Sequence, residues 1–170
     1  MCSEPVKAYL ISWLSRQQRQ AGDMASFERS HPGPWLVWEA GPWRPPSPDR
    51  STRAASERQA RLSSGDALAL QVATRPGREP FEGVRLGRGP DNDLVVDDGT
   101  LSRDHLLLRK QQEGWTVEDL HSSNGTQVDG RPVNGERVPI EPGAQIEAGS
   151  VRLTFYDAKG LYLRLKHGTT

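Results

Sequence analysis

The fold class is decided by the stretch Asn124-Gly-Thr-Gln-Val-Asp-Gly-Arg-Pro-Val-Asn-Gly135, in which turn residues alternate with a very short apolar run. The stretch contains three Asx-Gly pairs, and such pairs supply the positive φ angles of tight two-residue hairpins. The run Thr126–Val128, between the first two pairs, has the length and composition of a β-strand. This stretch therefore predicts short strands joined by hairpins.

The same pattern extends over most of the chain from Ala67 onward. Further turn pairs, Asp98-Gly99 and Pro142-Gly143, separate other apolar runs of strand length. The predicted strands are Ala67–Thr74, Gly83–Leu86, Leu94–Val96, His105–Arg109, Trp115–Asp119, Thr126–Val128, Arg137–Ile140, Ala144–Glu147, Val151–Tyr156 and Leu161–Lys166. No helical pattern interrupts them, so the sequence predicts an all-β fold, an antiparallel β-sandwich, rather than a parallel α/β enzyme fold.

The N-terminal part of the chain has a different composition. One apolar stripe predicts an amphipathic helix over residues 4–20, and Gly22 is expected to end it. A second helical turn is expected over residues 25–29. Prolines in the stretch 31–48 argue against a long helix or a central strand there, and Trp35–Trp38 is its only candidate strand.

The composition shifts divide the chain into four expected regions. They are an N-terminal extension with a helix and a Trp/Pro-rich segment over 1–50, a linker over 51–65, the β-sandwich domain over 66–166 and a tail over 167–170. The sequence leaves three interpretations of the extension open. It caps the sandwich or forms a small subdomain, it is an arm that docks on a partner, or it is disordered. The docking arm is considered because exposed tryptophan is costly and common at binding hot spots.

Charge and cysteine content narrow the class of partner. The chain has 170 residues, with 22 basic and 22 acidic side chains, and this balance argues against a nucleic-acid partner. No apolar run approaches the roughly 20 residues of a membrane span, and the N-terminus does not resemble a signal peptide. Cys2 is the single cysteine, so no intramolecular disulfide is expected. We therefore expect a cytoplasmic protein that binds neither nucleic acid nor membrane.

Three predicted loops, 86–94, 100–105 and 119–126, gather hydrogen-bond donors. These donors are Arg88, Ser102, Arg103, Ser122, Ser123 and Asn124. A guanidinium fork matches phosphate oxygens in a bidentate way, and hydroxyls can donate to the remaining oxygens. Because a phosphoryl group carries about −1.5 to −2 charges at pH 7, this donor set indicates capture of a phosphorylated ligand.

The order of these residues resembles the forkhead-associated (FHA) domain family over about residues 66–166. The matching elements are Gly87-Arg88, Asn92-Asp93-Leu94, Ser102-Arg103-x-His105, Asp119-Leu-x-Ser-Ser-Asn124-Gly125-Thr126 and the closing segment Pro139–Leu153. The resemblance implies a sandwich of about eleven strands in two antiparallel sheets. It also implies a module without catalytic activity that binds phosphothreonine in an extended peptide.

The resemblance further implies a role for each matching residue. Arg88 is expected to pair with the phosphate, and Ser102 is expected to donate its hydroxyl to it. Arg103 is expected to contact a second phosphate or the peptide, Ser123 to lie beside the phosphothreonine, and Asn124 to hold the peptide backbone. Architectural roles are implied for Gly87, His105 and Gly125.

The resulting hypothesis is a phosphothreonine-peptide-binding adaptor in Ser/Thr-kinase-linked signalling, whose partner is a kinase or its substrate. The alternative is an FHA-fold scaffold that binds an unphosphorylated partner through a sheet face or the Trp-rich segment. Ser102, Asp104 and His105 are too closely spaced on a strand to form a catalytic triad, so no enzyme is expected. No cofactor or metal is expected either, because the histidines lack metal-ligand spacing and the acidic residues around Asp93 predict a solvated loop.

Overall fold

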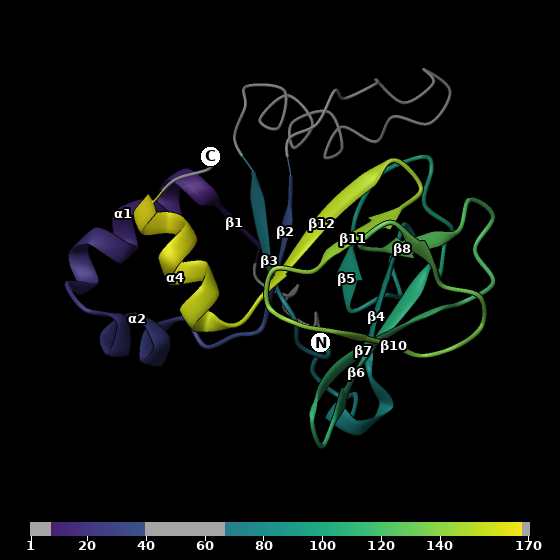
Figure 1. Cartoon of the computed structure of the whole chain (residues 1–170), viewed down its shortest axis with the longest axis horizontal. Coiled ribbons are helices and arrows are strands. Elements are labelled where there is room, and N and C mark those ends of the chain that lie inside the picture. The colour runs from purple at the N-terminus through teal and green to yellow at the C-terminus, as the bar shows by residue number, and fades with distance from the viewer. Residues whose placement is uncertain (1–7, 40–66, 168–170) are drawn as a thin grey trace.

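The computed structural model describes residues 8–39 and 67–167, in which two β-sheets face each other across a hydrophobic core (Figure 1). One sheet has seven strands, in the order β1 (Ala8–Leu10), β3 (Leu68–Gln71), β2 (Trp35–Trp38), β12 (Val151–Tyr156), β11 (Gln145–Ala148), β8 (Thr126–Val128) and β9 (Arg131–Pro132). The other has five, in the order β10 (Val138–Ile140), β7 (Gly114–Asp119), β6 (Leu106–Gln111), β4 (Val84–Gly87) and β5 (Leu94–Val95). All neighbours are antiparallel except β4 and β5. The predicted all-β sandwich is confirmed.

Three of the four predicted Asx-Gly pairs have the positive φ that the sequence predicts, whereas Gly99 of the Asp98-Gly99 pair does not. Asp129 has φ 50° and Gly130 has φ 82°, so both residues of the turn between β8 and β9 adopt the left-handed conformation. The glycines of two other turn pairs, Gly125 and Gly135, also have positive φ. Each predicted run from Ala67 to Tyr156 overlaps an observed strand.

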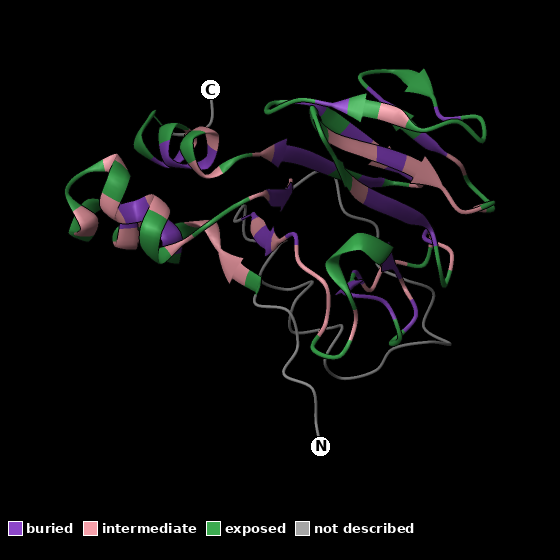
Figure 2. Cartoon of the chain, turned by 90° about the horizontal axis from the view of Figure 1, so that it is seen from below, coloured by how far each residue is buried: buried purple, intermediate pink, exposed green. Residues whose placement is uncertain are grey.

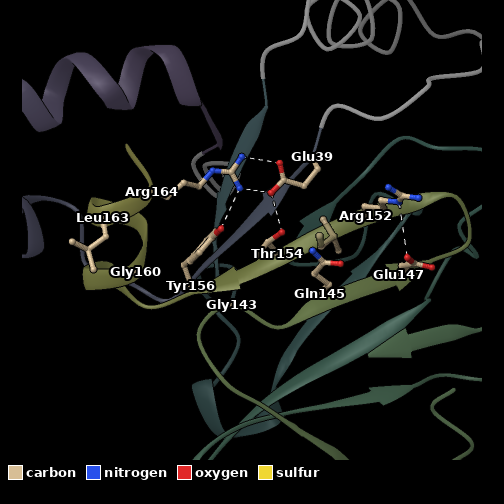
Figure 3. A pocket seen from close by; sticks show the side chains of 11 residues that line it. Glu39, Gly143, Gln145, Glu147, Arg152, Thr154, Tyr156, Gly160, Leu163 and Arg164 are labelled. Carbon is tan, nitrogen blue, oxygen red and sulfur yellow. Dashed lines mark hydrogen bonds and ion pairs between the residues drawn. The ribbon is translucent and has the colours of Figure 1, made fainter. Parts of the chain in front are cut away.

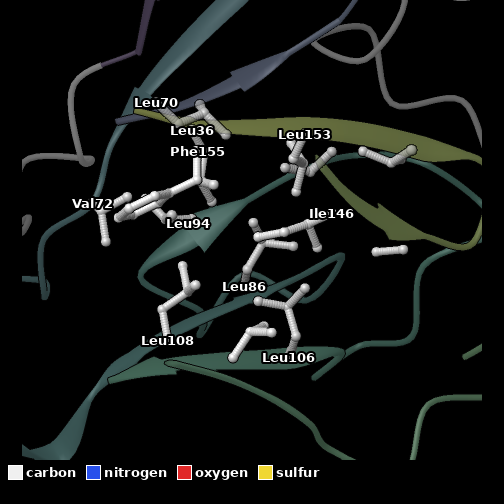
Figure 4. Close-up of a cluster of buried hydrophobic side chains, with 14 of the residues drawn as sticks. Leu36, Leu70, Val72, Leu86, Leu94, Leu106, Leu108, Ile146, Leu153 and Phe155 are labelled. Carbon is white, nitrogen blue, oxygen red and sulfur yellow. The ribbon is translucent and has the colours of Figure 1, made fainter. Parts of the chain in front are cut away.

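Apolar side chains from both sheets fill the space between them (Figure 4). Leu86, Leu106 and Leu108 of the five-stranded sheet meet Leu153 and Phe155 of the seven-stranded sheet, and each of these residues is at most 2% exposed. Burying a leucine or phenylalanine side chain contributes about 1.5–3 kcal/mol. This core therefore fixes the strand ends from which the loops project.

Strand β2 is an internal strand of the seven-stranded sheet, paired with β3 and β12, and all four of its residues are buried. Leu36 and Trp38 belong to the sandwich core, whereas Trp35 and Val37 pack on the opposite face. The expectation that prolines exclude a central strand from 31–48 was wrong. Pro34 lies just before the strand, where its missing N–H removes no ladder hydrogen bond from β2.

Three helices in the described residues cover the outer face of this sheet at β1, β3 and β2 (Figure 1). They are α1 (Ile11–Ala21), α2 (Met24–Ser30) and α4 (Ala158–His167). Their buried side chains and those of the sheet form a second cluster, the helix-side core, made of Leu14, Phe27, Trp35, Val37, Ala67, Ala69, Leu161, Tyr162 and Leu165. Figure 2 shows the consequence: the buried colour runs through the central strands and along one side of the helices.

The N-terminal helices differ from the prediction at one boundary. Helix α1 begins at Ile11 instead of within residues 4–10, because Ala8–Leu10 pairs with β3. Gly22, with φ 79°, follows its last residue as predicted. The second helix is confirmed over Met24–Ser30, and the Asp23 side chain caps it by accepting from the Ser26 N–H at 2.6 Å.

The strand predicted over Leu161–Lys166 was wrong, because this segment lies in helix α4. Leu161, Tyr162 and Leu165 are buried, a spacing that fits a helix face rather than a strand. The predicted linker 51–65 lies outside the described residues, as do the rest of segment 40–66, residues 1–7 and residues 168–170 of the tail.

Candidate functional site

Three loops meet at one end of the sandwich: the first loop after β4 (residues 88–93), the second before β6 (96–105) and the third between β7 and β8 (120–125). Hydrogen bonds join each of the others to the second. The Arg88 N–H donates to the Ser102 carbonyl at 3.0 Å, and the Ser123 N–H donates to Ser102 Oγ at 2.9 Å. The Asn124 side-chain amide donates to the Thr100 carbonyl at 2.8 Å. The structure thus brings Arg88, Ser102 and Asn124 together.

The Arg88 side chain is half-buried beside the second loop. Its Nε donates to the Leu101 carbonyl at 3.2 Å, which fixes the plane of the guanidinium. No carboxylate in residues 8–39 or 67–167 forms an ion pair with Arg88. Since Nε is one of five N–H donors of the guanidinium, the terminal nitrogens are left to bind an anion.

Gly87 allows the first loop to lie against the second. A Cβ atom at Gly87 would stand 2.2 Å from the Arg103 carbonyl oxygen and 2.9 Å from Asn92 Nδ2. Both contacts are too short for any side chain, and the carbonyl is a backbone atom that cannot rotate away. A glycine at this position is therefore required by close approach of the two loops.

His105 is fully buried and braces the second loop against the third. Its Nδ1 accepts from the Ser102 N–H at 3.1 Å, so the proton of a neutral ring lies on Nε2, which donates to the Gly125 carbonyl at 3.0 Å. Both ring nitrogens are engaged with backbone groups, and neither is placed to take a proton from the Ser102 hydroxyl. The geometry is that of a structural histidine and not of a catalytic base.

Asp119 organises the third loop from the end of β7. Its carboxylate accepts from the hydroxyls of Ser122 and Thr126, each at 2.6 Å, and from the Ser122 N–H at 3.0 Å. Burial raises the pKa of this carboxyl, but the hydrogen bonds from Ser122 and Thr126 outweigh it, so the pKa lies below its usual value. The Ser122 hydroxyl also accepts from the Gly125 N–H at 3.0 Å and so closes the turn.

A surface pocket lies elsewhere, over β11, β12 and α4 (Figure 3). It has a volume of about 610 Å³ and contains two arginines. Arg164 pairs with Glu39, and Arg152 pairs with Glu147 at 3.9 Å. Because both cations already face carboxylates, this pocket is less suited to an anion than the loop cluster around Arg88.

Comparison with known proteins identifies the family. The family model for the FHA domain matches residues 84–149, which include the three loops. The oxoglutarate dehydrogenase inhibitor of Corynebacterium glutamicum is 33% identical over 113 residues, which cover 61% of this chain and 74% of that protein. The chain belongs to the FHA domain family. The glycogen accumulation regulator GarA of Mycobacterium tuberculosis is 38% identical to this FHA protein over 69 residues, 41% of each chain.

Other comparisons define the extent of the similarity. The chain spans about half the length of the first curated relatives it matches, the oxoglutarate dehydrogenase inhibitors of Corynebacterium diphtheriae and Corynebacterium jeikeium. One structural match is the solution structure of an FHA domain from an Arabidopsis thaliana hypothetical protein. The match covers 74% of this chain and 86% of that domain, with 24% sequence identity and a TM-score of 0.49.

The predicted site residues of the FHA domain all lie on the three loops or their flanks. Arg103, Ser123 and Asn124 are exposed, whereas Ser102 and Arg88 are half-buried. The side chain of Asn124 already joins two loops through one N–H of its amide. A ligand can therefore bind only the second N–H or the side-chain oxygen. The carbonyl of Arg103 accepts from the Gly89 N–H at 3.0 Å, and the residue itself is exposed.

Sequence reasoning missed the role of Asp93. It is 3% exposed and accepts from the N–H groups of Arg75 and Arg85, both at 2.8 Å, and it pairs with the Arg78 guanidinium. The expectation of a solvated acidic loop was therefore wrong for this residue. The family motif contained Asp93, but no local pattern distinguishes a buried acid from an exposed one.

Asn92 is also buried and ties the first loop of the FHA domain to the second. Its Nδ2 donates to the carbonyls of Gly89 and Arg103. In the described part of the chain, no group of three or more His, Cys, Asp or Glu residues is arranged to hold a metal ion. None of the helices described is long and apolar enough to cross a membrane.

Proposed function

We propose that this FHA domain binds phosphothreonine peptides and acts as an adaptor in Ser/Thr-kinase-linked signalling in the cytoplasm. The phosphate is bound by the Arg88 guanidinium and the Ser102 hydroxyl, and the peptide by Arg103, Ser123 and Asn124. The chain carries out no catalysis in this role and needs no cofactor. Its partner is a phosphothreonine-containing protein, either a Ser/Thr kinase or the substrate of one.

The observation that carries this proposal is the position of Arg88. Its guanidinium is half-buried, held by the Leu101 carbonyl and paired with no carboxylate of the described residues. The Ser102 hydroxyl lies in the adjacent loop, and because its oxygen accepts from the Ser123 N–H, its own proton remains available to donate. A doubly charged phosphate satisfies both groups.

The regulatory part of the proposal is supported by the relatives. Two of them are an inhibitor of oxoglutarate dehydrogenase and a regulator of glycogen accumulation, so neither takes its name from a reaction that it catalyses. A binding module that recognises a phosphorylated partner fits this pattern.

The test is peptide binding measured by fluorescence anisotropy against a phosphothreonine library and the same library without phosphate. Wild type should bind a subset of phosphorylated peptides, and Arg88→Ala should lose about 2–5 kcal/mol, which is about thirty-fold or more in affinity. Arg85→Ala is the matched control, since Arg85 is an exposed arginine of β4, the strand that precedes Arg88, and its loss should leave the affinity unchanged. Equal affinity of the Arg88→Ala variant and wild type would refute the assignment.

The alternative of an FHA scaffold that docks through its Trp-rich segment gains no support from Trp35 and Trp38. Their exposed fractions are 1% and 8%, so neither side chain can contact a partner. A partner that uses this segment would need residues outside β2.

A further inference from the structure

Thr100 is a half-buried loop residue whose hydroxyl and backbone N–H are both hydrogen-bonded within the protein. Its hydroxyl donates to Asp98 Oδ1 at 2.5 Å and accepts from the Ser150 N–H at 2.8 Å. Its own N–H also donates to Asp98 Oδ1, at 2.8 Å. With both the hydroxyl and the N–H engaged, the side chain of Thr100 is turned toward the protein and is not free to read a peptide.

Ser150 belongs to the turn between β11 and β12, which lies outside the three loops of the site. This turn contacts two of them. Besides the bond from Ser150 to Thr100 in the second loop, the Gly149 N–H donates to the Gly125 carbonyl of the third loop at 3.3 Å. Gly149 also allows close approach: a Cβ atom there would stand 2.5 Å from Thr100 Oγ1 and 2.6 Å from the Thr100 carbonyl oxygen.

The segment that this turn anchors contacts Arg88, Ser123 and Asn124 of the proposed site. The Thr100 carbonyl accepts from the Asn124 amide, and the next carbonyl, that of Leu101, accepts from Arg88 Nε. The next residue, Ser102, holds the Ser123 N–H through its hydroxyl. The Leu101 side chain is 2% exposed and fixes the middle of the segment in the sandwich core.

We propose that the Gly149–Ser150 turn is a fourth, remote part of the phosphopeptide site and that Thr100 is its positioning residue. By joining the turn to residues 100–102, the Thr100 hydroxyl sets the orientation of Arg88 and Asn124 before any ligand arrives. This inference rests on the proposed function for its ligand, but the contacts that it depends on are within the protein itself.

Pre-organisation explains why such a clamp affects affinity. A guanidinium and an amide that are already oriented lose less side-chain freedom on binding, and ordering a mobile side chain has a cost at the moment of association. Without the Thr100 hydroxyl, the second loop keeps its Leu101 anchor but loses its link to the turn. The expected defect is therefore in recognition more than in folding.

The experiment compares Thr100→Val, which is nearly isosteric but lacks the hydroxyl, with Thr100→Ser, which keeps it. Affinity for a phosphothreonine peptide selected with wild type should fall about tenfold in Thr100→Val, as expected for the loss of about one net hydrogen bond. Thr100→Ser should restore binding to within about twofold. The unfolding midpoint of each variant is measured in parallel, and binding is measured well below it.

Gly149→Ala tests the close approach independently. The added methyl group must push the turn away from the Thr100 backbone, so affinity should fall at least as far as in Thr100→Val. Gly135→Ala is the matched control: Gly135 also has a positive φ, 71° against 57° for Gly149, but a Cβ atom there would meet nothing within 4 Å. The control has similar backbone strain without the contact and should bind as wild type does.

A spectroscopic measurement separates failure of this inference from failure of the proposed function. The Arg88 Nε–H and Asn124 side-chain amide resonances should shift in ligand-free Thr100→Val, while the Trp35 indole resonance in the helix-side core should not. If wild type binds no phosphopeptide, the proposed function fails, and these resonances still decide whether the clamp positions the two side chains. The inference is overturned if the Arg88 and Asn124 resonances are unchanged in Thr100→Val. It is also overturned if wild type binds a phosphopeptide and the Thr100→Val and Gly149→Ala variants bind it with the same affinity as wild type.

Discussion

Replacement of His105 by leucine should destabilise the fold and weaken phosphopeptide binding together. His105 is fully buried, and its two nitrogens satisfy the Ser102 N–H and the Gly125 carbonyl. Leucine fills a similar volume but offers neither an acceptor nor a donor. The perturbation therefore removes two hydrogen bonds while it leaves the packing of the core nearly intact.

The magnitude follows from what each partner retains. The Ser102 N–H loses its acceptor, which costs about 1–3 kcal/mol for a donor left unsatisfied in the interior. The Gly125 carbonyl keeps the hydrogen bond from the Gly149 N–H, so the loss of its bond from His105 decreases the free energy of unfolding by only about 0.5–1.5 kcal/mol. We therefore expect a decrease of about 2–4 kcal/mol in the free energy of unfolding, a large share of the roughly 5–15 kcal/mol of a typical domain.

The assay is urea denaturation followed by tryptophan fluorescence, with peptide affinity measured on the same samples. His105→Asn should recover part of the loss, because its side-chain oxygen can replace Nδ1 as the acceptor for Ser102. His167→Leu is the control, since His167 is exposed at the end of α4 and should change stability by less than about 0.5 kcal/mol. A His105→Leu protein as stable as this control, with unchanged affinity, would show that the histidine does not brace the loops.

Two further predictions concern the helix-side core and the third loop. Trp35→Ala should decrease the free energy of unfolding by about 3–5 kcal/mol, because removal of a buried indole leaves a cavity. Trp13→Ala is the control: it removes a 39% exposed ring stacked on Tyr9 and should decrease the free energy of unfolding by about 1 kcal/mol. Similar losses for the two variants in urea denaturation would contradict the burial of β2. The pKa of Asp119 is lowered in the folded state, so its contribution to stability is present above the unfolded-state value of about 3.9 and is lost as pH falls through the folded-state pKa. The free energy of unfolding is measured from pH 6 to pH 3, a range of about three pH units that includes the unfolded-state pKa. It should fall more steeply with decreasing pH for wild type than for Asp119→Asn. Parallel curves would exclude a stabilising role for the ionised Asp119 carboxylate.

Local sequence determined the strands and the turns between them. The Asp129-Gly130 pair favours its left-handed conformation locally, because glycine has no Cβ atom that opposes a positive φ and aspartate tolerates a positive φ better than most residues. In strands such as β4, the alternation of apolar and polar residues then turns one face toward the core. The order of Arg88, Ser102 and Asn124 along the chain was sufficient to predict which loops carry the donors.

Local sequence did not determine which layer each segment joins. Leu161, Leu163 and Leu165 alternate as in a strand, yet Leu163 is exposed and Tyr162 is buried, because α4 packs against α1 and α2. In the same way, all four residues of Trp35–Trp38 are apolar, which fits a strand buried on both faces or a buried helix turn equally well.

Only the tertiary structure decided these cases and the contacts that shape the site. Asp93 reaches Arg75 across 18 positions, and Thr100 reaches Ser150 across 50, so neither contact leaves a periodic signal in the chain. A sheet buried on both faces requires a second apolar layer, which exists here because helices from both ends of the chain meet on it. Hydrogen bonding in a turn is set by adjacent residues, whereas burial is set by whatever the rest of the chain brings to the same place.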